Sequence, residues 1–182
     1  MIVCLGWGSL IWDPRELPLV DPRLESWRDD GPELPLEFAR VSSGGRLTLV
    51  IDLEALPIKV LWNELSVANI PDAIKALRSR EGTKISWIGR WSSDGGINCI
   101  DAIDEWARKR KFKGVVWSAM PTKFNGQDNL RPSQVDVVEY LSRLEGNSRQ
   151  DAEEYVRKAP MQIDTPYRQA IVDRFGWAHL GA

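Results

Sequence analysis

The hydrophobic positions in the first half of the chain fall into short runs of the length of a β-strand. Residues 36–42 and 46–53 form two such runs, and the glycine-containing segment 43–45 lies between them. Because glycine readily adopts a positive φ, this arrangement predicts a β-hairpin. Further runs that predict strands cover residues 58–66, 84–91 and 114–120.

The chain begins with another strand-like segment. Residues 1–8, MIVCLGWG, start with apolar side chains that do not alternate with polar ones. This pattern is typical of a strand that is covered on both faces. We therefore expect residues 2–6 to form a central strand and the loop that follows to open into the main cavity.

The spacing of apolar residues predicts a helix over residues 69–82. Asn69 can cap its start, Pro71 suits the first turn and Gly82 suits the C-terminal stop. Glu81 is then the last residue before the glycine. The apolar positions that should face the core are Ile70, Ala73, Ile74 and Leu77.

Four more segments predict helices, and most of them lie in the second half of the chain. They are residues 97–111, 131–146, 148–159 and 165–176. In the first of these, Ile103, Trp106 and Ala107 should point inward. In the second, the residues that recur at helical spacing are Val135, Val138, Leu141 and Leu144. Strands followed by helices indicate an α+β fold. We expect a single domain over residues 1–182, built as a mixed, partly closed β-barrel with surrounding helices.

The composition is that of an ordinary globular protein, with 43% hydrophobic and 27% charged residues. The formal net charge of −2 gives the molecule no overall attraction for nucleic acid or an anionic membrane. The N-terminus has neither the basic flank nor the cleavage pattern of a signal peptide, and no apolar run has the length of a membrane span. We expect a cytoplasmic protein with no nucleic-acid or membrane partner.

Few residues are suited to metal or thiol chemistry. Cys4 and Cys99 are isolated from each other, and His179 is the single histidine. This set does not have the spacing of a zinc site or a disulfide framework, and neither HExxH nor a phosphate-binding GxxxxGK[ST] pattern occurs. We therefore expect no metal and no cofactor, with any chemistry carried by carboxylates, tyrosines, lysines, hydroxyls or backbone dipoles.

The chain also has nine tryptophans and one short basic run. The tryptophan rings could stack on sugars or bases. Four of them lie in periodic apolar segments, which favours packing in the core: Trp62, Trp87, Trp106 and Trp117. The basic run 108–111 ends a predicted helix, where cations complement the helix dipole and stay solvated. Trp7 and Trp12 differ because they flank a glycine loop, so these two could line a pocket.

That loop, within LGWGSLIWDP at residues 5–14, has two possible roles. A pair of glycines with a serine is often a simple turn. Alternatively, successive N–H groups of Gly6, Trp7, Gly8, Ser9 and Leu10 could form a nest that holds an anion.

Glu81 is the carboxylate with the most unusual predicted position. A helix C-terminus carries partial negative charge, which disfavours an ionised acid there. In apolar surroundings such a carboxylate would have a raised pKa, as a general base working near neutral pH requires. Most glutamates at helix ends simply face solvent, so a solvent-exposed Glu81 without a catalytic role is the alternative.

The same residues carry a family resemblance. LGWGSLIWDP resembles the N-terminal signature of the γ-glutamylcyclotransferase superfamily, in which a strand leads into a Tyr-Gly-Ser loop. Its Gly-Ser-Leu-Ile-Trp form is most similar to the ChaC-type, glutathione-degrading branch. ALRSREG, residues 76–82, resembles the Leu-x-x-Arg-Glu run with the family's catalytic glutamate. TPYRQAIVDRFG is similar to a C-terminal Pro…Tyr-x-x-x-Ile stretch. Two features depart from the family: Trp7 replaces the loop tyrosine, and residues 92–112 look like an inserted helix.

The resemblance implies an enzyme that cyclises a γ-glutamyl amine or peptide, glutathione among the candidates, to 5-oxoproline and releases the amine. It implies Glu81 as the catalytic residue. The implied substrate-binding residues are Gly6, Trp7, Gly8, Ser9, Leu10 and Tyr167. The implied partner is a small γ-glutamyl compound; the amine half and the oligomeric state stay open.

Two other functions remain possible on sequence grounds. One is a non-catalytic binding protein of the same fold that holds a γ-glutamyl-like or amino-acid ligand, which the replacement by Trp7 and the inserted helix favour. The other is a two-carboxylate hydrolase that uses Glu81 with Glu64 or Asp52 while tryptophans stack on a sugar.

Overall fold

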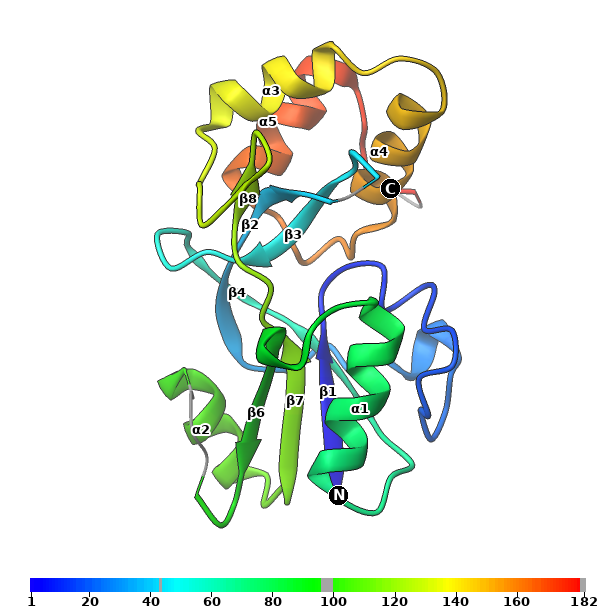
Figure 1. The fold of residues 1–182 in the computed structure, drawn as a ribbon, viewed down its shortest axis with the longest axis vertical. Helices are drawn as coiled ribbons and strands as arrows, with labels where there is room; N and C mark the ends of the chain where they lie inside the picture. Colours follow the sequence, from blue (N-terminus) through cyan, green and yellow to red (C-terminus); the bar gives the residue numbers. More distant parts are fainter. Residues whose placement is uncertain (43, 96–99, 181–182) are drawn as a thin grey trace. The chain divides into compact units, whose positions relative to one another are not determined.

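The computed structural model describes residues 1–42, 44–95 and 100–180. Within these residues the chain is mixed α+β, with two curled mixed sheets, one of them a half-barrel, and five α-helices (Figure 1). This confirms the α+β class. No helix in the described part of the chain is long and apolar enough to cross a lipid bilayer.

The chain divides into two compact units. The first comprises residues 1–34 and 59–120, and the second comprises residues 35–58 and 121–182. The expectation of one domain over residues 1–182 stays a prediction, and each unit is described by itself below.

The sheet of the first unit has the strand order β5-β1-β7-β6. Strand β1 pairs antiparallel with β5 and parallel with β7, so it is an interior strand, and all five of its residues are buried. The expectation for residues 2–6 is therefore confirmed. The strands of this sheet are β1 (Ile2–Gly6), β5 (Leu61–Glu64), β6 (Ile88–Ser92) and β7 (Gly114–Ser118).

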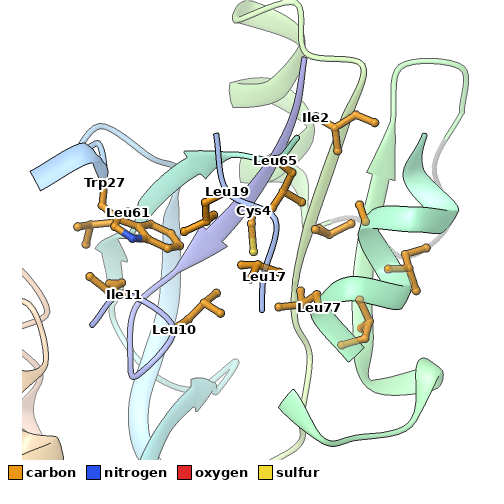
Figure 2. Close-up of a cluster of buried hydrophobic side chains, with 14 residues drawn as sticks. Ile2, Cys4, Leu10, Ile11, Leu17, Leu19, Trp27, Leu61, Leu65 and Leu77 are labelled. Atoms are coloured by element: carbon orange, nitrogen blue, oxygen red, sulfur yellow. The ribbon is translucent and has the colours of Figure 1, made fainter. Parts of the chain in front are cut away.

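Helices α1 (Ile70–Glu81) and α2 (Asp101–Lys109) complete the first unit, with short 3₁₀ turns at Leu24–Ser26 and Ile85–Trp87. Helix α1 packs against β6 and β7. It is labelled in Figure 1, and it buries Ala73, Ile74 and Leu77, as the helical spacing predicted. Figure 2 shows the resulting apolar cluster, in which Cys4 of β1 lies among leucines. The labelled leucines there are Leu10, Leu17, Leu19, Leu61, Leu65 and Leu77.

The second unit contains the other sheet and the last three helices. Strand β2 pairs antiparallel with β3, which confirms the predicted hairpin, and parallel with β8. Helix α3 packs against α5, and α4 packs against β3. The elements are β2 (Glu33–Val41), β3 (Leu47–Ile51), β4 (Pro57–Lys59), β8 (Lys123–Phe124), β9 (Gln127–Asp128), α3 (Gln134–Ser142), α4 (Gly146–Lys158) and α5 (Pro166–Phe175).

The single strand predicted over residues 58–66 is wrong, because this segment forms two strands in different sheets. Strand β4 pairs with β2, whereas β5 pairs with β1. Val60 lies between them and exchanges backbone hydrogen bonds with Gly31 and Pro32. A continuous apolar pattern does not reveal a change of partner strand, since both strands bury side chains.

The apolar residues that recur at helical spacing in the segment of α3 do not share one buried face. Val135 is 66% exposed, while Val137 and Leu141 are the buried residues. A repeat of three residues drifts by about 60° per step around a helix of 3.6 residues per turn, so four such positions cannot all face one side.

Other boundaries shifted by a few residues. Strand β6 begins only at Ile88, after the 3₁₀ turn, and α2 begins at Asp101, while Cys99 lies outside the described residues. Trp62 and Trp117 are buried as predicted, but Trp87 and Trp106 are only half-buried.

Candidate functional site

Helix α1 places Glu81 at its last position, and the local sequence explains why. The Asn69 side chain accepts the N–H of Asp72 at 2.9 Å and caps the start of the helix. Gly82 has a φ of 59° and ends the helix in the left-handed conformation, which glycine tolerates well. The buried face of the helix holds Glu81 against the unit, so its side chain is only 12% exposed.

The loop after β1 is a tight, largely buried turn. The N–H of Ile11 donates to Gly8 O at 3.0 Å, and the N–H of Asp13 donates to Ser9 O at 2.9 Å. Within the described part of the chain, the N–H groups of Gly8, Ser9 and Leu10 have no hydrogen-bond partner. They are therefore free to donate to an anion, as a nest of N–H groups does.

Gly6 leads into this loop at a point of close approach. A Cβ at this position would lie 2.6 Å from Trp27 Cζ3 and 2.9 Å from Trp27 Cη2. Only glycine fits against the indole ring without a shift of the backbone or the ring.

Arg80 joins the loop to Glu81. Its Nη1 donates to Glu81 Oε1 at 3.1 Å, and its Nη2 donates to Ser9 Oγ at 3.2 Å. Its Nε and Nη2 also donate to Asp13 O, at 3.2 and 2.6 Å. The structure thus brings the predicted residues Ser9 and Glu81 onto one guanidinium group.

The electrostatics of Glu81 reflect two opposing effects. Burial raises the pKa of its carboxyl above the ordinary value, and this effect outweighs the ion pair and hydrogen bond with Arg80 and the charge of Arg15, all of which lower it. Burial also raises the pKa of the Cys4 thiol far above its usual range, and the nearby charge of Glu81 raises it further. Cys4 is therefore a protonated thiol at neutral pH and is poorly suited to act as a nucleophile.

Arg15 adds a second cation near the carboxylate. Its Nη1 donates to Arg80 O at 3.4 Å, and its Nε pairs with Asp13 Oδ2 at 3.2 Å. Arg15 and Arg80 also line a groove of about 440 Å³, together with Lys75 and other residues of α1. The lining of this groove includes neither Glu81 nor residues 6–10, so the expectation that the loop opens into the main cavity stays a prediction.

The predicted tyrosine, Tyr167, belongs to the second unit. Its hydroxyl donates to Pro132 O at 2.9 Å, and its backbone N–H donates to Glu37 Oε2 at 3.3 Å. The guanidinium of Arg131 lies 5.5 Å from the centre of its ring. Burial raises the pKa of its phenol.

Sequence reasoning did not single out Arg80 or Arg15, although Arg80 lies within the run 77–81 that carries the family resemblance. Only the fold shows that the Arg80 side chain turns toward the loop, where it is 5% exposed. Trp7, expected to line a pocket, is 5% exposed and therefore buried, and Trp12 is half-buried.

The carboxylates suggested for a hydrolase have other surroundings. Asp52 is buried in the second unit and pairs with Arg131 Nε at 2.5 Å. Glu64 lies in β5 of the first unit and is half-buried. Among the described residues, no three His, Cys, Asp or Glu side chains form a group that could hold a metal ion.

Comparison of the chain with models of known protein families found no match, and comparisons with curated proteins and with solved structures found none either. A function for this chain is therefore inferred from the geometry of the site.

Proposed function

We propose that the protein is a γ-glutamylcyclotransferase-like enzyme with Glu81 as its general base. The substrate is a γ-glutamyl amine or peptide, and the products are 5-oxoproline and the free amine. The proposal includes the finer fold, a partly closed barrel of the γ-glutamylcyclotransferase type, and a cytoplasmic location with no nucleic-acid or membrane partner.

The observation that supports this function best is the meeting of Ser9 and Glu81 at Arg80. A buried carboxylate with a raised pKa lies beside a loop in which, among the described residues, the N–H groups of Gly8, Ser9 and Leu10 have no hydrogen-bond partner. A proton acceptor next to a set of donors is the pair of elements that this cyclisation requires.

The nucleophile belongs to the substrate, so the protein needs no activated serine or cysteine. The α-amine attacks the γ-carbonyl carbon, a new C–N bond closes the five-membered lactam, and the C–N bond to the leaving amine breaks. Glu81 takes one proton from the α-ammonium and gives it to the leaving nitrogen. The second proton lost by the α-ammonium ends on the released amine, so the overall reaction conserves protons.

The loop supplies the electrostatic part of catalysis. The N–H groups of Gly8, Ser9 and Leu10 bind the α-carboxylate or the oxyanion that develops on the γ-carbonyl, and the Ser9 hydroxyl is an added donor. Holding the substrate folded back on itself contributes on the order of 7–11 kcal/mol when the orientation is ideal.

The direct test is to incubate the purified protein with a panel of γ-glutamyl amino acids, γ-glutamyl amines and glutathione, and to quantify 5-oxoproline by mass spectrometry. Release of 5-oxoproline together with an equal amount of amine supports the proposal. Release of glutamate instead would indicate hydrolysis and would contradict it.

One observation favours the alternative, a binding protein for a γ-glutamyl-like ligand. Trp7, at the place of the loop tyrosine in the family that the sequence resembles, supplies no hydroxyl and is 5% exposed. Isothermal titration calorimetry with the same panel distinguishes the two functions, because saturable binding without any 5-oxoproline would favour the binding protein.

A further inference from the structure

We infer that Arg80 is a positioning residue, which fixes the Glu81 carboxylate against the Ser9 loop and keeps it in its proton-accepting form. This inference rests on the proposed function for its catalytic consequence. Its electrostatic part concerns Glu81 alone and is testable without turnover.

The geometry of the guanidinium supports a positioning role. Arg80 points its planar fork at three groups from two segments: the Glu81 carboxylate, the Ser9 hydroxyl and the Asp13 carbonyl. A planar guanidinium fixes directions for several hydrogen bonds at once, which a lysine ammonium does not do. The distance from the loop to the carboxylate is therefore set through one rigid group.

Burial makes this contact electrostatically important. The side chains of Arg80 and Glu81 are 5% and 12% exposed, so solvent screens the pair poorly. A buried carboxylate without a cation would take up a proton and would then be unable to accept one from the substrate. Arg80 limits this tendency, while burial still leaves the pKa of Glu81 raised.

The other charged or titratable groups that influence Glu81 are few in the described part of the chain. Arg15, from the loop that covers the end of α1, lowers the pKa of Glu81 and is itself paired with Asp13. Cys4, from β1, lies on the sheet side and is uncharged because burial raises the pKa of its thiol. Arg80 is therefore the nearest permanent charge to Glu81, and Arg15 is a weaker, more exposed one.

Two substitutions separate the charge of Arg80 from its shape. Arg80→Gln removes the charge, so the acid limb of the kcat/KM profile should move to higher pH, with about a tenfold loss of kcat/KM at the acid end. Arg80→Lys keeps the charge but not the fork. Its acid limb should stay near the wild-type position, while kcat falls about tenfold across the profile because the carboxylate and the loop are no longer held together.

The control is Arg78→Gln, which removes the same charge from an exposed position on the same helix. It should leave the profile unchanged. If Arg80→Gln does not fold, Arg80→Lys provides the second variant. Arg15→Gln is a comparison, because Arg15 influences the same carboxylate from a side chain that is 61% exposed. It should move the acid limb in the same direction by a smaller amount.

A measurement without substrate keeps this inference separate from the proposed function. Carbon-13 NMR of glutamate-labelled protein, with the Glu81 signal assigned through Glu81→Gln, follows the titration of that carboxyl directly. The Glu81 titration should move to higher pH in Arg80→Gln and stay in place in Arg78→Gln. An unchanged titration in folded Arg80→Gln, or a wild-type kcat in Arg80→Lys if Arg80→Gln is unfolded, overturns the inference even if the wild type makes 5-oxoproline. A shifted titration in a protein that makes none supports the electrostatic role of Arg80 and contradicts the proposed function.

Discussion

Arg168 is a buried cation that donates its side-chain hydrogen bonds to four backbone carbonyls. Its Nη1 contacts Pro160 O and Ile163 O at 2.6 and 2.9 Å, and its Nη2 contacts Val156 O and Ala159 O at 3.1 and 2.8 Å. The residue is 4% exposed, and no carboxylate in the described part of the chain forms an ion pair with it. Arg168 therefore ties the end of α4 and the following turn to α5.

We expect Arg168→Met to destabilise the second unit by about 3 kcal/mol. The methionine preserves much of the apolar stem, but three carbonyls lose their donor, while Pro160 O keeps the N–H of Ile163 at 3.0 Å. Each unsatisfied buried group costs about 1 kcal/mol or more. The substitution also removes the cost of burying the guanidinium charge, and this gain offsets part of the lost stability. Arg168→Lys should cost about half as much, since one ammonium reaches only some of the four carbonyls.

Urea unfolding followed by fluorine NMR measures this effect in the right part of the molecule. Trp177 is the only tryptophan in the sequence of the second unit, so its 5-fluorotryptophan signal reports on that unit. Arg174→Met, an exposed arginine on the same helix, is the matched control and should change the free energy of unfolding by less than about 0.5 kcal/mol. A loss below about 1 kcal/mol in Arg168→Met would refute the reasoning.

Two further predictions concern buried positions in the two units. Burial raises the pKa of Glu37 above its ordinary value of 4.5, so the stability that this group contributes is fully present below the unfolded-state pKa and is lost as the pH rises through the folded-state pKa. Glu37→Gln should flatten that decline in urea-unfolding experiments at a series of pH values, and an unchanged slope would count against it. Gly6→Ala should cost about 1–3 kcal/mol because its Cβ meets Trp27 at 2.6 Å. The same substitution should cost less in a Trp27→Leu background, and an equal cost in both would show that the ring is not the obstacle.

The sequence predicted the elements whose signals are local. The cap at Asn69, the stop at Gly82 and the apolar spacing between them sufficed for α1, which ends at Glu81 as expected. The first strand and the β2–β3 hairpin were predictable for similar reasons, since each depends on a short run and its flanking residues.

Features that depend on distant partners were not predictable from the sequence. The change from β4 to β5 at Val60 depends on which strands lie alongside, and the buried face of α3 depends on its packing against α5. The contact of Arg80 with Ser9 joins residues 71 positions apart. The sequence shows that Ser9 and Arg80 are both polar, but it does not show that their side chains lie within hydrogen-bond distance.

The central claim, that Glu81 is the general base, is tested most directly by the kinetics of Glu81→Gln. Glutamine keeps the size of the side chain and can still hydrogen-bond to Arg80, but it cannot take a proton from the α-ammonium. We expect kcat for 5-oxoproline release to fall by about 10²- to 10⁴-fold with little change in KM, while Glu105→Gln, an exposed glutamate on α2, stays at the wild-type level. Near-normal turnover by Glu81→Gln would contradict the account.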